Sequence, residues 1–347
     1  MSRRVAALAA LILAALILAA VAACGGDPAT GDDAGGDPID AGIDAPGCDP
    51  ERPRAVPITA VTVGPAALED RVVAFIDGAT RSIDVQMYTF TLNRIADRLI
   101  AADRRGAPVR VLLDANQLDA GLRSRLQGGG VEVKLAPTGF PNAHAKYVVV
   151  DGDRLLIESG NFTVAGMSDQ RNFAVEDRDP QDVADAAAVF AADWAGTTAT
   201  LSCSRLVVTP GDSRLRIQTL IASATTSLDI ALYYLSDTAI RAAVMTAKNR
   251  GIAVRVLLAS TGEIPENATT ASALTAGGVP VRTLANPVLH AKVIIADGAR
   301  ALVGSNNMSI TSLRDNRELG VIMREPGPVA AVLAQFNTDW NAGVAWQ

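Results

Sequence analysis

Apolar and polar residues recur with helical and strand-like periods from residue 57 to the end of the chain, in the same order twice. The first unit has helical spacing of apolar positions over 66–79 and then an apolar run at 83–88. We expect a helix and a strand there, because the two elements differ in the period with which side chains return to one face. A longer helix at 92–105 and a second strand at 109–114 follow. The second unit predicts the matching elements at 212–225, 228–233, 238–250 and 254–258.

Each unit continues with a third helix, a third strand and then an almost wholly apolar strand, at 146–150 and at 292–296. A further strand and a closing helix that ends at Trp194 or Trp340 complete the pattern. Nearly continuous apolar strands that alternate with helices are typical of a sheet covered on both faces. The predicted fold class is α/β, with two tandem α/β/α sandwich lobes at 57–202 and 203–347 that are related by a pseudo-twofold axis.

An internal repeat supports this division. The segment at 81–88 resembles the segment at 226–233, and 105–113 resembles 250–258. The offset between the copies is 145 residues at position 81, 148 at position 129 and 146 at position 144, so few insertions separate the two units.

The first 24 residues have the pattern of an export signal. Arg3 and Arg4 precede an apolar run that extends to Ala23, and Val21-Ala22-Ala23-Cys24 resembles a bacterial lipobox. We expect lipidation at Cys24; the alternative is a simple signal peptide cut nearby. Gly25 follows, so the aspartate that favours retention in the inner membrane is absent. The interpretation is an exported bacterial lipoprotein of the cell envelope (periplasm or outer membrane) or a secreted protein, held at a membrane by its N-terminal lipid.

Residues 25–56 consist mainly of Gly, Asp, Ala and Pro and predict a disordered acidic tether. Eight carboxylates and two arginines give the tether a charge of −6, and two arginines give the leader +2. Because the whole chain carries −6, the body carries about −2, which does not indicate a protein that follows a nucleic-acid backbone. A disulfide between Cys48 and Cys203 is one expectation in an oxidising compartment, and two free thiols are the other.

The chain has two histidines, and each is followed two residues later by a lysine: His144 with Lys146, and His290 with Lys292. On a strand this spacing directs both side chains to one face. A turn downstream adds neutral donors, and Gly304 permits close backbone approach. Fixed positive charge together with such donors suits an anionic tetrahedral group. No cluster with metal-ligand spacing is seen, so we expect neither a metal nor another cofactor. The expected phosphate-binding residues are Ser159, Asn161, Ser305 and Asn307.

These residues resemble the signature of the phospholipase D superfamily, His-x-Lys-x4-Asp-x6-Gly-Ser-x-Asn. The second copy has it in full, and the first departs only at Glu158, which replaces the glycine. The resemblance extends over roughly 57–345.

The resemblance implies one site shared by both lobes. One histidine attacks phosphorus to form a phosphohistidine and the other protonates the leaving group, after which water or another alcohol enters with the roles reversed. The lysines and asparagines would hold the non-bridging oxygens, and the serines would support them. Family habit favours His144 as the nucleophile. Asp151 and Asp297, at strand ends, are expected to be structural.

A second repeated segment lies downstream of the motif, and in it Asn172 and Glu318 occupy equivalent positions. The family commonly has an acidic residue there, bonded to a catalytic histidine. An asparagine accepts an N–H bond but does not stabilise an imidazolium as a carboxylate does, so the two histidines should differ in basicity. Which histidine Glu318 contacts is left open by the sequence.

The remaining prominent residues favour packing roles. Trp194 and Trp340 are expected in the core or between the lobes, and Gly128-Gly129-Gly130 lacks the strand-to-helix context of a phosphate cradle. A core position is also the preferred interpretation for four aromatic residues that could instead line the cleft, Tyr88, Phe90, Tyr233 and Tyr234.

The function expected from these observations is metal-independent hydrolysis of a phosphodiester, with a phospholipid head group preferred because the leader directs the enzyme to a membrane. The alternatives are an EDTA-resistant endonuclease with nucleic acid as substrate, and a phosphatidyl transferase of the cardiolipin-synthase type. A non-catalytic binding module is disfavoured because both His-Lys pairs are intact. We expect a monomer.

Overall fold

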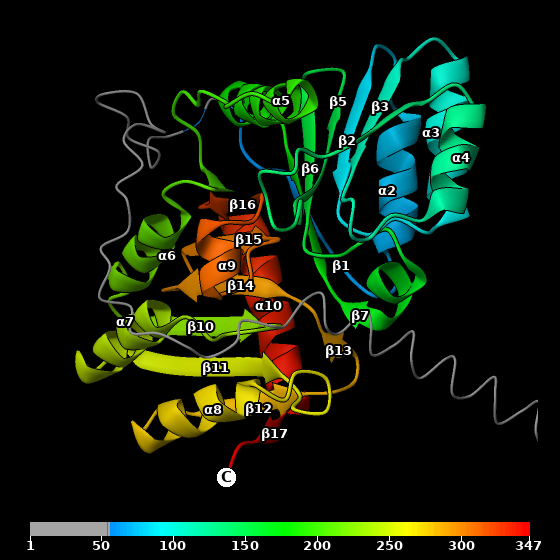
Figure 1. The fold of residues 1–347 in the computed structure, drawn as a ribbon. Coiled ribbons are helices and arrows are strands. Elements are labelled where there is room, and N and C mark those ends of the chain that lie inside the picture. Colours follow the sequence, from blue (N-terminus) through cyan, green and yellow to red (C-terminus); the bar gives the residue numbers. More distant parts are fainter. Residues whose placement is uncertain (1–53, 55) are drawn as a thin grey trace, which may run out of the picture.

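Each repeat folds around one mixed β-sheet in the computed structural model, which describes residue 54 and residues 56–347 (Figure 1). The first sheet has the strand order β1-β8-β6-β5-β2-β3-β4. Its strands are β1 (Ala60–Val63), β2 (Ile83–Met87), β3 (Val109–Leu113), β4 (Glu132–Leu135), β5 (Lys146–Val150), β6 (Arg154–Glu158) and β8 (Phe173–Asp177). The helices of this lobe are α2 (Leu68–Asp77), α3 (Asn93–Arg104), α4 (Ala120–Gly128), the π-helical turn η1 (Ala165–Asp169) and α5 (Pro180–Ala195).

The second sheet repeats this order and adds one strand, β9-β16-β15-β14-β10-β11-β12-β17. Its strands are β9 (Leu206–Thr209), β10 (Ser227–Leu232), β11 (Ala253–Ala259), β12 (Val281–Leu284), β14 (Lys292–Ala296), β15 (Arg300–Gly304), β16 (Glu318–Met323) and β17 (Val344–Ala345). The helices are α6 (Ser213–Ala222), α7 (Thr238–Asn249), α8 (Asn267–Ala276), α9 (Ile310–Arg314) and α10 (Pro326–Ala342). The predicted pair of α/β lobes is confirmed.

Three helices cover the outer face of each sheet, α2, α3 and α4 in the first lobe and α6, α7 and α8 in the second (Figure 1). The inner faces meet in one shared core, to which α5 contributes Val189 and α10 contributes Val332. Ile157 of the first sheet and Val303 of the second belong to the same cluster. Because burial of apolar area is the main force that holds packed layers together, this common core holds the lobes in one arrangement.

Backbone pairing also joins the lobes. A separate parallel ladder forms between β7 (Gln170–Arg171) and β13 (Val288–Leu289), and an isolated bridge joins Ala143 to Arg317. In both contacts the segment just before one lobe's histidine pairs with the segment just before the other lobe's Asn172 or Glu318. The histidines are therefore placed by both halves of the chain.

The periodic elements predicted from the sequence are all present, and the strand at 146–150 has the predicted limits. Sequence reasoning missed the short strands β1, β7, β9, β13 and β17, and also β8 and β16, which follow the Asn turn. The strands β1, β7, β9, β13 and β17 are two-residue or edge strands, which have too few alternating positions to be recognised because tertiary pairing rather than local pattern forms them.

The leader, Cys24 and almost all of the predicted tether lie outside the described residues. Cys203 is disulfide-bonded; because Cys48 is also outside the described residues, the Cys48–Cys203 pairing stays a prediction. Within residue 54 and 56–347, no helix has the length and hydropathy needed to cross a bilayer.

Candidate active site

Two equivalent strands carry the His-Lys pairs. Lys146 is the first residue of β5 and Lys292 the first of β14, so each histidine lies just before its strand. Both imidazoles are buried, with 3% and 4% of their surfaces exposed, and both lysines are fully buried. Lys146 donates to the carbonyl oxygen of His144, and Lys292 donates to that of His290 at 2.8 Å. Each lysine thus folds back beside its own histidine.

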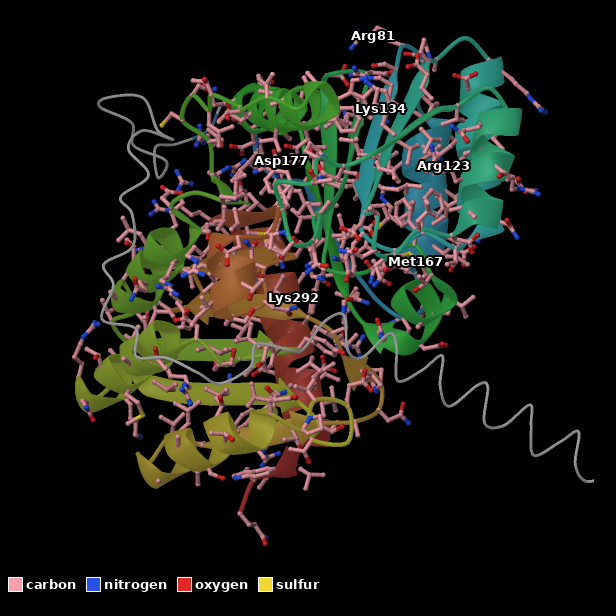
Figure 2. All side chains as sticks on the ribbon, viewed as in Figure 1. Arg81, Arg123, Lys134, Met167, Asp177 and Lys292 are labelled. Carbon is pink, nitrogen blue, oxygen red and sulfur yellow. The ribbon has the colours of Figure 1, made fainter. Side chains whose placement is uncertain are left out.

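The two pairs form one charge cluster where the lobes meet, and Figure 2 shows Lys292 in the middle of the molecule. Burial lowers the pKa of His290 well below its usual value, and the charges of Lys292 and Lys146 add to that effect. Burial also lowers the pKa of His144, to about 4; Glu318 opposes this effect and Lys146 adds to it. Both imidazoles are therefore neutral at pH 7, the form in which a ring nitrogen can attack phosphorus.

Glu318 lies behind His144, across the pseudo-twofold axis. Its two carboxylate oxygens are 2.8 and 2.9 Å from Nδ1 of the imidazole. The hydroxyl groups of Ser305 and Ser312 donate to the same carboxylate at 2.5 and 2.6 Å. Burial acts to raise the pKa of Glu318, but the neighbouring imidazole and these hydrogen bonds lower it overall, so the group is a carboxylate. The question that the sequence left open is answered: Glu318 contacts the histidine of the other lobe.

Asn172 has the equivalent position behind His290. Its Oδ1 is 3.0 Å from Nδ1 of that imidazole, and its Nδ2 donates to the carbonyl of Gly166 at 2.9 Å. Ser159 donates its hydroxyl to Oδ1 at 2.9 Å, which completes the orientation of the amide. Since an amide oxygen only accepts, Nδ1 of His290 carries the hydrogen and Nε2 is the basic nitrogen. Nζ of Lys292 lies 3.2 Å from that Nε2.

Of the four residues expected to bind phosphate, the two asparagines differ from the two serines. The Oδ1 atoms of Asn161 and Asn307 are buried and have no hydrogen-bond partner among the described residues. Because an amide oxygen only accepts, these two atoms are suited to a donor group, and the oxygens of a phosphate can be held only through the Nδ2 groups of the same amides. Ser159 and Ser305 are occupied with Asn172 and Glu318, so in this structure they orient the groups behind the histidines.

Aromatic rings pack against both histidines. Tyr88 lies 4.6 Å from His144 between ring centroids, and Tyr233 lies 4.6 Å from His290. Nζ of Lys146 is 5.0 Å from the centre of the Tyr88 ring. The four aromatic residues expected in the core are buried, yet two of them also form walls of the site. Their position directly after β2 and β10 was the sequence signal for that second role.

Asp151 and Asp297 follow the far ends of the two strands that begin at Lys146 and Lys292, about 16 Å from those lysines for five residues of extended chain. Both have positive φ values, 57° and 56°. Asp151 accepts from the backbone N–H groups of Thr80, Arg81 and Ser82 at 2.6–3.1 Å. Figure 2 shows Arg81 at the outer end of the first lobe, far from Lys292. This geometry agrees with the predicted structural role.

Sequence reasoning missed Asp114, which follows β3 and is buried. Its Oδ2 accepts from the backbone N–H of Ala143 at 2.7 Å, and its Oδ1 accepts from that of Asn116 at 2.8 Å. The carboxylate therefore holds the residue before His144. A carboxylate directly after an apolar strand was the available signal.

Sequence reasoning also did not predict two ion pairs that join the lobes. Arg317 binds both carboxylate oxygens of Asp193 on α5 at 2.9 Å, and Arg171 binds Asp339 on α10 at 2.8 Å. All four residues lie in repeated segments of the sequence, but their partners are in the opposite lobe. These pairs hold the segments that lead to Asn172 and Glu318.

In the described part of the chain, no group of three or more His, Cys, Asp or Glu side chains is arranged to hold a metal ion. The polar atoms of the site are those of the two His-Lys pairs, Asn161, Asn307 and the groups behind the imidazoles. This combination can bind an oxyanion and move a proton.

Comparison with known proteins gives a family match in both lobes. The profile described as "Cardiolipin synthase, PLD-like domain" matches residues 72–194 and 217–340, which together exceed half of the chain. Cardiolipin synthase A of Pseudomonas aeruginosa is 29% identical over 292 residues, which cover 71% of this chain and 59% of that protein. The chain therefore spans less than two thirds of this relative's length.

Two further comparisons concern one lobe and the whole fold. Phospholipase D of Rickettsia prowazekii is 31% identical over 119 residues, 33% of this chain and 57% of its own length. The crystal structure of phosphatidylserine synthase from Haemophilus influenzae has a TM-score of 0.65 and 13% identity, with 84% of this chain and 90% of that chain covered. At this identity the likeness concerns the fold alone.

Proposed function

The chain belongs to the phospholipase D superfamily, and from this premise we propose that it cleaves phosphodiesters without a metal, through a phosphohistidine. The observation that carries the proposal is the pair of buried neutral imidazoles, each with a lysine beside it and a hydrogen-bond acceptor behind Nδ1. Such an arrangement leaves one basic ring nitrogen on each histidine for chemistry at phosphorus.

In the first half of the reaction, Nε2 of His144 attacks phosphorus and the bond from phosphorus to the leaving oxygen breaks. The ring then carries a positive charge, which the Glu318 carboxylate stabilises through Nδ1–H. His290 gives its proton to the leaving oxygen. The anionic substrate offsets the lysine charges that lower the pKa of His290, so this imidazole takes up a proton when substrate binds.

In the second half, neutral His290 removes a proton from water, whose oxygen attacks phosphorus as the bond to Nε2 of His144 breaks. The products are a phosphomonoester and an alcohol. Lys146, Lys292, Asn161 and Asn307 hold the non-bridging oxygens while charge builds on the five-coordinate phosphorus. The carboxylate behind one histidine and the amide behind the other support His144 as nucleophile and His290 as acid.

We propose a phospholipid as the substrate, with release of its head group. The lipobox-like sequence at Cys24 supports a lipid anchor in the bacterial cell envelope, which would keep the site beside a bilayer. A body charge of about −2 lacks the basic excess that supports binding to nucleic acid.

Transfer to an alcohol is the second candidate, because the longer of the two sequence matches reported above is to a protein named cardiolipin synthase A. The same phosphohistidine would react with a lipid hydroxyl group in place of water. Nothing in the first half of the reaction differs between these outcomes, so the acceptor decides between them.

The test is a parallel assay of the full chain in EDTA with vesicles of phosphatidylcholine, vesicles of phosphatidylglycerol and cardiolipin, and single-stranded DNA. Hydrolysis of lipid without DNA cleavage is the expected result. Formation of cardiolipin from phosphatidylglycerol would assign the transferase, and cleavage of DNA alone would assign the nuclease. The proposed chemistry is wrong if His144→Ala or His290→Ala keeps full activity, and Glu132→Gln, on an exposed residue, is the control.

A further inference from the structure

Glu158 is the single departure of the first lobe from the signature, and its counterpart is Gly304. In the second lobe Gly304 lies opposite Gly320, and a Cβ atom added to Gly304 would be 2.3 Å from the Gly320 Cα atom. The second lobe therefore has no room for a side chain there. The first lobe has Ala174 opposite Glu158 and accommodates a whole glutamate at this point.

The register of β5 and β6 places Glu158 beside Lys146. Tyr147 pairs with Ile157 in this antiparallel ladder, so the next pair is Lys146 with Glu158. Directly opposite residues project from the same face of a sheet and are near neighbours. The first lobe thus sets a carboxyl group next to its lysine, whereas Lys292 has a glycine at the same position.

Within the described part of the chain, the residues that share the sheet face of Glu158 on the neighbouring strands are apolar, with Lys146 as the charged exception. Glu158 is 1% exposed, and both of its carboxyl oxygens are buried without a hydrogen-bond partner among the described residues. Val148 of β5, Leu156 of β6 and Ala174 of β8 lie on this face, within the apolar cluster that the outer helices complete. Lys146 is the charged residue whose field acts on Glu158.

A glutamate with a purely structural role would normally have its oxygens hydrogen-bonded, because an unpartnered buried carboxylate is costly. Burial raises the pKa of Glu158 to about 8, although Lys146 acts to lower it. The group is therefore protonated at pH 7 and ionises in the mildly alkaline range.

We propose that the protonation state of Glu158 controls how strongly the first lobe holds the phosphate of the substrate. As a neutral acid, Glu158 leaves the charge of Lys146 to the substrate. As a carboxylate, it attracts that charge and repels the anion. Glu158 is thus a positioning residue that acts through Lys146, and the inference rests on the proposed role of this lysine in binding phosphate.

Proton linkage determines the direction in which substrate affinity changes with pH. An acid with a raised pKa is neutral below that value, so substrate affinity is high below about pH 8 and falls as the pH rises through it. In the same range a bound anion favours the neutral acid, so anion binding takes up a proton.

The first experiment measures KM for bis(4-nitrophenyl) phosphate from pH 6.5 to 9.5. In the unmodified enzyme we expect KM to rise about tenfold across pH 8, the change that corresponds to an interaction of one pKa unit. Glu158→Gln, which keeps the shape of the side chain, and Glu158→Gly, which copies the second lobe, should reduce the rise by that factor and leave only the part due to proton uptake by His290. Glu132→Gln should retain it. An equal rise in KM in the Glu158 variants would overturn the proposal.

The second experiment does not depend on turnover. Calorimetry of sulfate binding at pH 8.5, in buffers of different ionisation enthalpy, counts the protons taken up with this tetrahedral anion. The unmodified enzyme should take up more protons than Glu158→Gln, and equal uptake would refute the inference. Proton-linked sulfate binding that requires Glu158, without any hydrolysis, would support the inference and reject the proposed function. Hydrolysis without proton-linked sulfate binding would support the proposed function and reject the inference.

Discussion

Replacement of Glu318 by glutamine tests the proposal that His144 is the nucleophile and His290 the acid. The carboxylate accepts from Nδ1 of His144 and from the hydroxyls of Ser305 and Ser312. Glutamine keeps the size of the side chain but removes the negative charge. We expect the fold to persist, because a hydroxyl group can accept from the new NH₂ group as well as donate.

The magnitude follows from the kind of bond that is lost. A hydrogen bond to a charged group contributes about 1.5–3 kcal/mol, and its full strength is reached only when His144 becomes positively charged on attack. Loss of that energy from the transition state lowers kcat by roughly 10- to 150-fold. KM should change little, because neutral His144 in the ground state gains less from the charge.

The assay is steady-state hydrolysis of bis(4-nitrophenyl) phosphate, with Asn172→Gln as the matched variant behind the other histidine. Asn172→Gln should mainly impair proton delivery by His290, so its defect should be smaller with a leaving group that needs no proton, such as 4-nitrophenolate. The defect of Glu318→Gln should not depend on the leaving group in that way. A kcat for Glu318→Gln within twofold of the unmodified enzyme would refute the reasoning.

Three further predictions follow from the same geometry. If the phosphohistidine intermediate is trapped without exposure to acid and the protein is mapped by peptide, the phosphoryl group should be on His144. A phosphoryl group on His290 would reverse the assigned roles. Because His144 must be neutral to attack and its pKa is lowered to about 4, the decline of kcat/KM on the acid side should begin only as the pH falls towards 4, and an acid-side decline centred near 6.5 would contradict this. Asp193→Asn leaves the buried guanidinium of Arg317 without its carboxylate and should lower the free energy of unfolding by about 3–5 kcal/mol in a denaturant titration; a loss below 1 kcal/mol would show that this pair does not stabilise the contact between the lobes.

Local pattern was sufficient for most of the secondary structure and for the doubling of the fold. The periods of apolar residues predicted the helices and the long buried strands, since these elements place side chains on fixed faces whatever surrounds them. The short strands β7 and β13 had no such signal, because each consists of two residues that pair only when the two lobes meet.

The candidate site also has features that the sequence determined and features that only the tertiary structure decided. The sequence by itself determined the two His-Lys pairs, the Ser and Asn turns, the unequal residues Asn172 and Glu318 and the odd Glu158, because chemistry of that kind requires particular side chains at particular spacings. Only the tertiary structure decided the partners: Glu318 with His144, Asn172 with His290, and each interlobe arginine with an aspartate of the opposite lobe. The physical reason is that each of these contacts crosses the pseudo-twofold axis, and a repeated sequence contains no information on whether a residue contacts its own repeat or the other one.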